Sequence, residues 1–173
     1  MDPHINIRIA TPQDAAFLAE FGARVFYESY AAENDPTDMA AYLAGAFSLQ
    51  KQAAELLQAG SVFFIASNDQ EALGYARMQT GPAPTCITGW NPIELVRMYS
   101  VRTMIGKGIG GGLMQACISH AGAGGHDRIW LSVWQKNPRA IAFYQNWGFT
   151  IAGTATFTIG SDIQSDWIME RIV

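Results

Sequence analysis

Cysteine is scarce in this chain of 173 residues, which contains only Cys86 and Cys117. The two lack the CxxC spacing of a metal or redox motif, and no cluster of other metal ligands lies beside either of them. The sequence therefore supports neither a zinc site nor a disulfide framework. We expect two free thiols and no bound metal.

Charged residues are also few. They make up 15% of the chain against 49% hydrophobic residues, and the net charge is −4. No cluster of lysine and arginine is present to hold the phosphate backbone of a nucleic acid. The composition is that of a folded globular protein and not of a disordered chain. We therefore expect a soluble protein that does not bind nucleic acid.

Long apolar runs are missing as well. No run approaches the roughly 20 residues needed to span a bilayer, and residues 1–4 do not begin a basic region followed by an apolar core. We expect a cytoplasmic protein with no membrane partner. The length suits one domain with a sizeable core and is short for two. Residues 1–173 are therefore expected to form a single domain.

Alternation, capping residues and glycines divide the chain into a series of expected helices and strands. Isoleucines alternate with other residues over 5–10, which predicts a strand, and Thr11-Pro12-Gln13-Asp14 predicts the start of a helix that ends before Asn34-Asp35-Pro36. Further helices are expected from residue 36, at 49–57, from the glycines near 110 to about 120, and from 137 to 148, with strands at 62–66, 73–78, 93–101, 128–134, 149–157 and 164–172. The order is β-α-α-α-β-β-β-α-β-α-β-β. We expect the early hairpin to be antiparallel, the later strands to pair in a parallel or mixed way, and helices to cover both faces of the sheet.

The stretch over residues 93–114 carries the clearest functional signal. It has the order strand, glycine loop, helix, with five glycines among residues 106–112. A loop with few side chains leaves its N–H groups bare, and the first turn of the following helix adds unpaired N–H groups and the positive end of the helix dipole. Such a loop attracts phosphate.

Three phosphate-binding motifs and a loop without a ligand compete for this stretch. A Walker A motif fails, because Val101 and Gly108 stand where it needs glycine and serine or threonine. The dinucleotide pattern GxGxxG matches at Gly106, Gly108 and Gly111, but the acidic residue expected after the next strand is missing. A loop without a ligand leaves the entropy cost of five glycines unexplained, and a close-approaching partner explains it best. The remaining candidate is a loop for the pyrophosphate of an acyl-CoA.

Two segments resemble the GNAT superfamily of N-acetyltransferases. Residues 98–101 (Met-Tyr-Ser-Val) followed by 106–110 (Gly-Lys-Gly-Ile-Gly) resemble its first cofactor motif, and residues 137–149 resemble the second, N-x-x-A-x-x-F-Y-x-x-x-G-F. The resemblance implies a single-domain α/β fold with a mixed, mostly antiparallel twisted sheet flanked by helices on both faces. It also implies acetyl-CoA as cosubstrate and a primary amine on a small molecule or a peptide as acceptor, and it is compatible with a homodimer. An acyl-CoA-binding sensor without activity is the alternative.

The resemblance also implies which residues bind the cofactor. They are Met98, Tyr99, Ser100, Val101, Ile105, Gly106, Lys107, Gly108, Ile109, Gly110, Gly111 and Asn137. The family usually has arginine or glutamine where this chain has Ile105. Backbone donors do not depend on the side chain, so the cradle survives this change. Lys107 and Arg102 are candidates to replace the missing polar group.

Catalytic roles fall on two residues. Glu94 is the candidate base, and because an unperturbed glutamate has a pKa near 4.3, burial must raise that pKa. The alternative for Glu94 is an ordinary carboxylate, solvated or paired with Arg97. By resemblance, Tyr144 is the general acid and backbone N–H groups near Met98 stabilise the oxyanion, where the family's strand separates from its neighbour. Phe143 and Tyr144 are adjacent on a helix, so we expect one in the core and the other free for chemistry, or else an aromatic pair used only for packing.

The acceptor side is harder to predict. Tyr27, Glu28 and Tyr30 lie near the junction of the first two helices, as do Glu33, Asp35, Asp38 and Tyr42. Carboxylates among aromatic rings suit a cationic amine, although helix capping alone also explains several of them. Residues 26–30 and 130–134 most resemble the polyamine-acetylating branch of the family.

Overall fold

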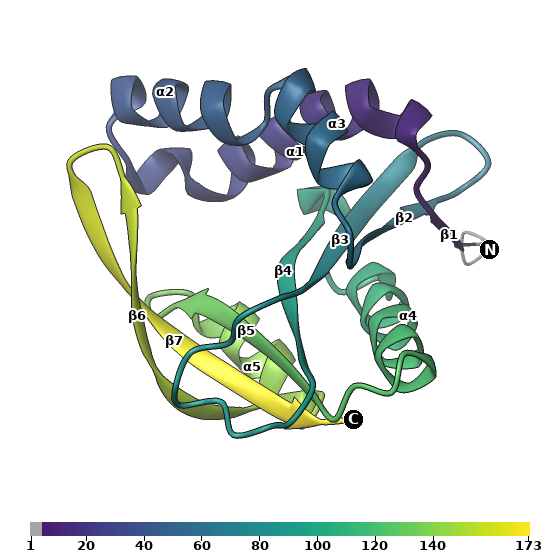
Figure 1. Ribbon diagram of the computed structural model, residues 1–173. Coiled ribbons are helices and arrows are strands. Elements are labelled where there is room, and N and C mark those ends of the chain that lie inside the picture. The colour runs from purple at the N-terminus through teal and green to yellow at the C-terminus, as the bar shows by residue number, and fades with distance from the viewer. Residues whose placement is uncertain (1–4) are drawn as a thin grey trace.

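The computed structural model, which describes residues 5–173, has the predicted order of elements around a seven-stranded sheet (Figure 1). The strands are β1 (Asn6–Ile9), β2 (Ser61–Ser67), β3 (Ala72–Thr80), β4 (Pro92–Ser100), β5 (Arg128–Trp134), β6 (Thr150–Ile159) and β7 (Asp162–Ile172). The α-helices are α1 (Ala15–Tyr30), α2 (Pro36–Ala46), α3 (Leu49–Leu57), α4 (Ile109–Ala123) and α5 (Pro138–Asn146). The expectation drawn from residues 1–4 lies outside the described part.

Local chemistry explains where the first helices begin. The Asp14 carboxylate accepts a hydrogen bond from the Thr11 N–H at 2.7 Å and pairs with Arg8 at 2.7 Å, which fixes the turn before α1. Asp35 accepts from two N–H groups at the start of α2, and the Ser48 hydroxyl accepts from the Lys51 N–H at the start of α3. Each cap satisfies N–H groups that have no partner within the helix.

The sheet has the order β1-β2-β3-β4-β5-β7-β6, in which only β4 and β5 are parallel neighbours. The expected antiparallel hairpin of β2 and β3 is confirmed, as is a mixed sheet. Parallel or mixed pairing between β5 and β6 was also expected, and there the structure differs, because β6 turns at Gly160 and forms a hairpin with β7. The strand β7 then lies between β5 and β6, antiparallel to both.

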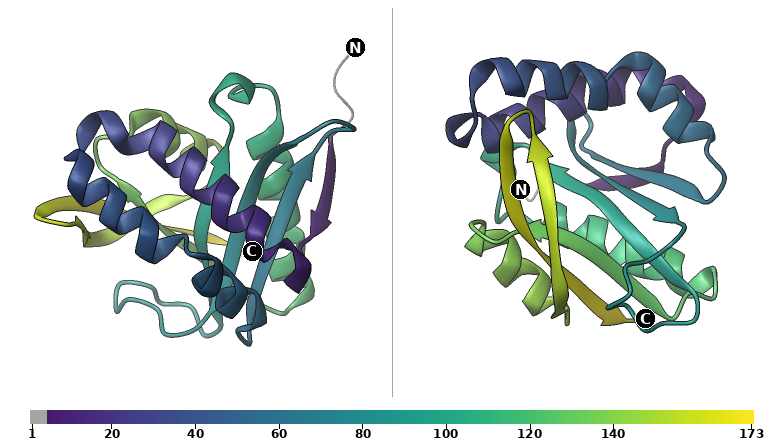
Figure 2. Two further views of the ribbon diagram at one scale, coloured as in Figure 1. Left: turned by 90° about the horizontal axis from the view of Figure 1, so that it is seen from above. Right: turned by 60° about the vertical axis from the view of Figure 1, so that its left-hand side comes forward.

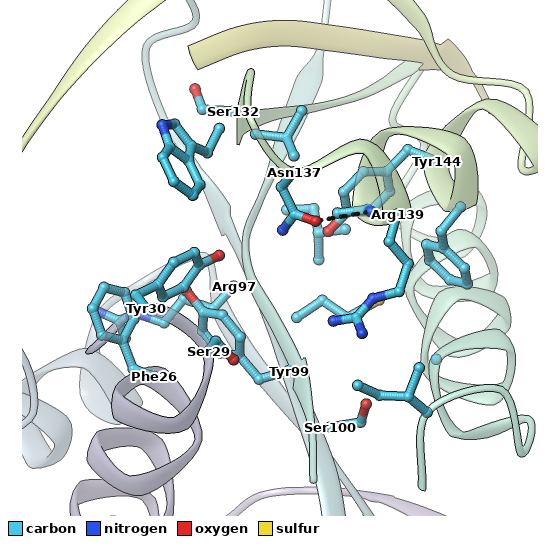
Figure 3. Close-up of a pocket in the computed structure, with 18 of the residues that line it drawn as sticks. Phe26, Ser29, Tyr30, Arg97, Tyr99, Ser100, Ser132, Asn137, Arg139 and Tyr144 are labelled. Carbon is cyan, nitrogen blue, oxygen red and sulfur yellow. Dashed lines mark hydrogen bonds between the residues drawn. The ribbon is translucent and has the colours of Figure 1, made fainter. Parts of the chain in front are cut away.

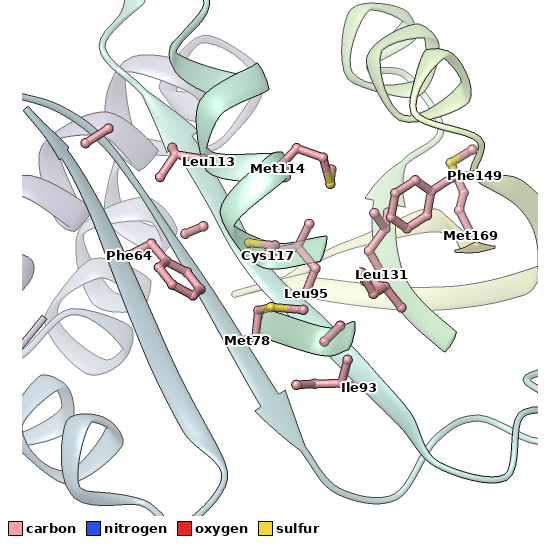
Figure 4. Packing of buried hydrophobic residues seen from close by; sticks show 14 of the residues in the cluster. Phe64, Met78, Ile93, Leu95, Leu113, Met114, Cys117, Leu131, Phe149 and Met169 are labelled. Carbon is pink, nitrogen blue, oxygen red and sulfur yellow. The ribbon is translucent and has the colours of Figure 1, made fainter. Parts of the chain in front are cut away.

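Helices cover both faces of the sheet, as predicted (Figures 1 and 2). The helices α1 and α3 lie over one face, and α4 and α5 lie over the other. The largest core cluster is on the α4 side, where Leu113, Met114 and Cys117 pack against Met78 and Leu95 (Figure 4). Both cysteines are free thiols, as expected, and burial raises the pKa of Cys117 to about 12.

The middle of the sheet opens into a wedge. The strands β4 and β5 pair only from Pro92 to Glu94, opposite residues 128–130. Beyond Glu94, β4 continues with β3 alone and β5 continues with β7 alone. A β-bulge falls in the same place, because Arg97 and Leu95 pair with consecutive residues of β3 and Val96 between them is left over. The backbone of β4 after Glu94 is therefore free of a strand partner on its β5 side.

Across the described ranges, none of the helices is both long and apolar enough to cross a bilayer.

Candidate active site

A cavity of about 940 Å³ lies at the wedge between β4 and β5 (Figure 3). We call its wall of glycine loop, first turn of α4 and α5 the cofactor side. We call its wall of α1, β7 and the ends of β4 and β5 the acceptor side. Because β4 and β5 part here, no strand separates the cofactor side from the acceptor side.

The glycine loop gives the cofactor side its shape. Gly106 and Gly108 have φ angles of +80° and +89°, which side chains other than glycine's rarely allow, and a Cβ at either position would meet open space. The first helical hydrogen bond runs from the Gly112 N–H to the Gly108 carbonyl at 2.9 Å. The N–H groups of residues 109–111 come before that bond, so they have no acceptor within the helix. A diphosphate fits this bare, positively polarised loop.

Not every glycine of the loop needs a ligand to explain it. A Cβ on Gly112 would lie 2.8 Å from the Cδ1 atom of Ile7 on β1. A Cβ on Gly110 would lie 3.3 Å from the Phe143 ring. The glycine content was expected to reflect a close-approaching ligand, but at these two positions the close neighbour is the protein itself.

Most of the residues predicted to bind the cofactor line the cavity. They are Met98, Tyr99, Ser100, Ile105, Gly106, Gly108, Gly110, Gly111 and Asn137. The lining does not include Val101, Lys107 or Ile109. The Ile109 side chain is buried in the core at 1% exposure, so only its backbone can serve the loop. Asn137 caps α5, and its side-chain oxygen accepts from the Ala140 N–H at 3.2 Å.

Arginines stand near the position where the family's usual polar residue is replaced by Ile105. Arg102 lines the cavity, as does Arg139, which sequence analysis missed. Figure 3 shows the Arg139 side chain reaching from α5 into the cavity. The sequence did offer one signal for Arg139, namely its position two residues after Asn137 in the segment that resembles the second motif.

Tyr144 and Phe143 do not divide into one core and one free residue. Both are half-buried, both line the cavity, and their rings meet edge to face at 5.4 Å between centroids. The expectation is wrong because α5 packs over the open wedge, where one broad face of the helix meets both the core and the cavity. Burial raises the pKa of Tyr144 well above its usual value, so the phenol stays protonated.

Glu94 lies where the two strands part and lines the cavity. Burial raises its pKa, and the positive charges of Arg77 and Arg97 oppose that rise. The direction is the one that a base working near neutral pH needs. The alternative of an ion pair between Glu94 and Arg97 does not hold in residues 5–173, since Arg97 is bound elsewhere.

The partner of Arg97 is Glu55 on α3, which sequence analysis did not find. Glu55 binds Arg97 at 2.7 Å and Arg77 at 3.1 Å, and all three side chains are at most 12% exposed. Each arginine also lies over an aromatic ring, Arg97 over Phe47 and Arg77 over Phe63. Residues 55 and 97 are 42 positions apart, so no local pattern connects them.

The predicted acceptor residues separate in the structure. Glu28 and Tyr30 line the cavity together with Glu33, whereas Tyr27 is 55% exposed and does not line it. Capping and turn contacts explain two of the other carboxylates. Asp35 caps α2, and Asp38 accepts from both the N–H and the hydroxyl of Ser161 at the tip of the β6–β7 hairpin.

The last strands also contribute to the acceptor side, as the family resemblance implies. Trp134 of β5 and two residues of β7, Gln164 and Asp166, line the acceptor side. The Tyr30 ring lies 6.5 Å from both the Trp134 ring and the Tyr99 ring. Residues 130–134 were singled out from the sequence, but the position of β7 beside β5 had no signal in it, so Gln164 and Asp166 were not recognised.

The sequence pattern of the acetyltransferase (GNAT) family matches residues 23–149. The chain belongs to this family. An uncharacterized N-acetyltransferase from Mycobacterium tuberculosis is 31% identical over 158 residues, covering 91% of this chain and 97% of the relative. Another from Lactobacillus delbrueckii subsp. lactis is 27% identical and covers 96% of each. The resemblance to the GNAT superfamily is thus confirmed, and this GNAT protein is an N-acetyltransferase.

Solved structures share the fold. The PaiA N-acetyltransferase from Thermoplasma acidophilum, in complex with coenzyme A, has a TM-score of 0.78 at 22% identity and covers 98% of this chain and 99% of its own. The ribosomal-protein-alanine N-acetyltransferase from Brucella melitensis has a TM-score of 0.69 at 20% identity and covers 97% of this chain and 99% of its own. The predicted α/β fold, with its mostly antiparallel sheet and helices on both faces, is confirmed.

Proposed function

We propose that this GNAT protein moves an acetyl group from acetyl-CoA directly to a primary amine, either a small polyamine-like amine or a protein amino group. The observation that carries the proposal is the wedge itself. It brings the glycine loop and a half-buried carboxylate, Glu94, to one cavity. A thioester held on one side would face an amine held on the other.

The cofactor side would hold acetyl-CoA mainly through main-chain groups. The N–H groups of residues 109–111 would bind the pyrophosphate, with Arg102 and Arg139 as nearby cations. The unpaired backbone of β4 after Glu94 would accept the extended arm and donate to the developing oxyanion. When bound, acetyl-CoA supplies the activated acetyl group.

Glu94 would take the proton from the acceptor. An amine with a pKa of about 10.4 costs roughly 4–5 kcal/mol to deprotonate at pH 7, so a base beside it matters. Glu94 must be ionised to act, and its pKa is raised. Activity is therefore expected to fall as the pH falls through that raised pKa.

Tyr144 would donate to the departing sulfur. Burial makes its phenol a weaker acid, but the same surroundings also make a thiolate a stronger base. Cys117 illustrates this effect within the same protein, since burial raises the pKa of its thiol to about 12. Burial therefore need not make the proton transfer from the Tyr144 phenol to the sulfur less favourable than it is between a free phenol and a free thiolate in water.

An acyl-CoA-binding sensor remains the second candidate, favoured by the exceptional Ile105 in the loop. The two are separated by following CoA release with a thiol-reactive dye across a panel of primary amines, and by titrating CoA in a calorimeter. We expect CoA to bind and amine-dependent release to follow. Tight CoA binding without release for any amine or peptide would replace the enzyme by the sensor.

A further inference from the structure

Asp166 is a buried carboxylate in the cavity with an oxygen that has no hydrogen-bond partner among residues 5–173. Asp166 on β7 is 7% exposed and lines the acceptor side, and its Oδ1 atom is buried without a hydrogen bond from any of residues 5–173. A buried carboxylate oxygen without a donor is costly and calls for an explanation. The sheet itself does not need this charge, since the backbone of Asp166 already pairs with β5 on one side and with β6 on the other.

No cation among residues 5–173 neutralises this charge. The ion pairs found across the described residues use Asp14, Glu55, Asp127 and Glu170, and none uses Asp166. Burial raises the pKa of Asp166 with no arginine opposing it, in contrast to Glu94, which faces two. An arriving cation would therefore stabilise the ionised form of Asp166.

The surroundings of Asp166 suit an ammonium group. Asp166 pairs with Trp134 across the β5–β7 ladder, and the Tyr30 ring lies 6.5 Å from the Trp134 ring. Burial raises the pKa of Tyr30, and the negative charge of Asp166 adds to that rise. A carboxylate attracts a cation by its charge, and the faces of two neighbouring aromatic rings add a cation–π attraction.

Asp166 and Glu94 cannot hold the same ammonium. Glu94 pairs with Trp130 and Asp166 pairs with Trp134, which lie four positions apart on β5. Four positions along a strand measure about 13 Å, and the two residues stand on strands at opposite sides of β5, about 10 Å apart across the sheet, so their backbones are about 16 Å apart. The cavity thus presents two well-separated anionic ends to one acceptor.

We propose that Asp166 binds a second positive charge of the acceptor, so that this enzyme prefers an acceptor with a cationic group at each end over one with a single amine. This inference rests on the proposed function and narrows it to one substrate class. Glu94 receives the reacting amine, and Asp166 with Tyr30 and Trp134 holds the distal ammonium. Asp166 is in this view a specificity-determining residue, and its carboxylate does not enter the acetyl transfer.

The test compares linear α,ω-diamines with monoamines of the same chain length, from six to twelve carbons, because the acceptor must reach from Glu94 to Asp166. For the wild type we expect kcat/KM to be at least about tenfold higher for the best diamine. Asp166→Asn should lower kcat/KM for the diamine to about the monoamine value, and Asp166→Glu should keep part of the preference. Asp69→Asn, in the exposed β2–β3 turn, removes the same charge and should change neither substrate.

Two kinetic results would overturn the inference. One is a wild type that treats diamine and monoamine alike. The other is an Asp166→Asn variant that loses both activities equally, since that result points to folding or chemistry and not to a second cation. The thermal unfolding midpoint of each variant distinguishes a folding defect from a defect in the chemistry. If Asp166→Asn does not fold, Asp166→Glu takes its place in the test.

Calorimetric binding of the diamine to the CoA-bound protein separates this inference from the proposed function. Binding that weakens about tenfold in Asp166→Asn, in a protein that acetylates nothing, would retain the cation site and reject the enzyme. Equal acetylation of monoamines and diamines, with diamine binding that does not depend on Asp166, would retain the enzyme and reject the cation site. A wild type that does not bind the diamine at all would reject the site.

Discussion

On the cofactor side of the cavity most polar groups belong to the main chain, whereas on the acceptor side they belong to side chains. The cofactor side depends on N–H groups of consecutive residues, with the glycines needed to expose them. The acceptor side depends on Tyr30, Glu94, Trp134 and Asp166, which come from four different elements. We therefore expect the cofactor side to tolerate side-chain changes such as Ile105, and the acceptor side to change its specificity with single substitutions.

The largest effect is expected where the acceptor side is anchored. Glu55→Gln leaves Arg77 and Arg97 buried without their counter-charge, which should lower the free energy of unfolding by about 3–5 kcal/mol. Urea unfolding measures the change. Glu71→Gln, in the exposed β2–β3 turn, is the matched control and should have no effect. A loss below about 1 kcal/mol for Glu55→Gln would mean that the network does not hold this wall.

Tyr144→Phe tests the one side chain on the cofactor side that is given a chemical role. Loss of the phenol should lower kcat by about 100-fold or more, because proton donation to the sulfur is lost. The Kd for CoA should change little, since the ring and its packing remain. Tyr27→Phe removes an exposed hydroxyl away from the cavity and should leave kcat unchanged. A Tyr144→Phe variant with normal kcat assigns this ring to packing.

Gly108→Ala tests whether the cradle is made by the backbone. At φ +89° an alanine costs about 1–2 kcal/mol, so the loop should leave this conformation and CoA affinity should fall about tenfold. Calorimetry with CoA measures it. Gly45→Ala adds a methyl group in α2, where no atom lies within 4 Å, and serves as control. Unchanged CoA binding in Gly108→Ala would move the phosphate site elsewhere.

The smallest effect expected is a shift of the pH profile. Arg97 opposes the burial that raises the pKa of Glu94, so Arg97→Met should raise that pKa further. Because Glu94 acts as the ionised base, the acidic limb of the kcat/KM profile should move to higher pH. Lys51→Met on the exposed face of α3 should leave the limb in place. If the acidic limb of the profile does not move in Arg97→Met, the titration of Glu94 does not produce that limb.

The elements and the cofactor side were largely predictable because their signals are local. Caps such as Asp35, the spacing of apolar residues and the glycines of the loop act within a few residues, so the order of helices and strands follows from the chain alone. The loop and Asn137 likewise lie in two continuous segments. The same local reasoning failed for Phe143 and Tyr144, because which side of α5 is buried depends on the wedge beneath it.

The order of the elements, the glycine loop and the family follow from the sequence alone. Three features appear only in the folded structure: the point where β4 leaves β5, the pairing of Arg97 with Glu55 in place of Glu94, and the position of Asp166 in the cavity without a hydrogen-bond partner among residues 5–173. These features depend on β7 lying between β5 and β6 and on α3 reaching β3 and β4. Contacts between residues so far apart in the chain leave no periodic or local pattern, because they arise from how the finished layers pack together.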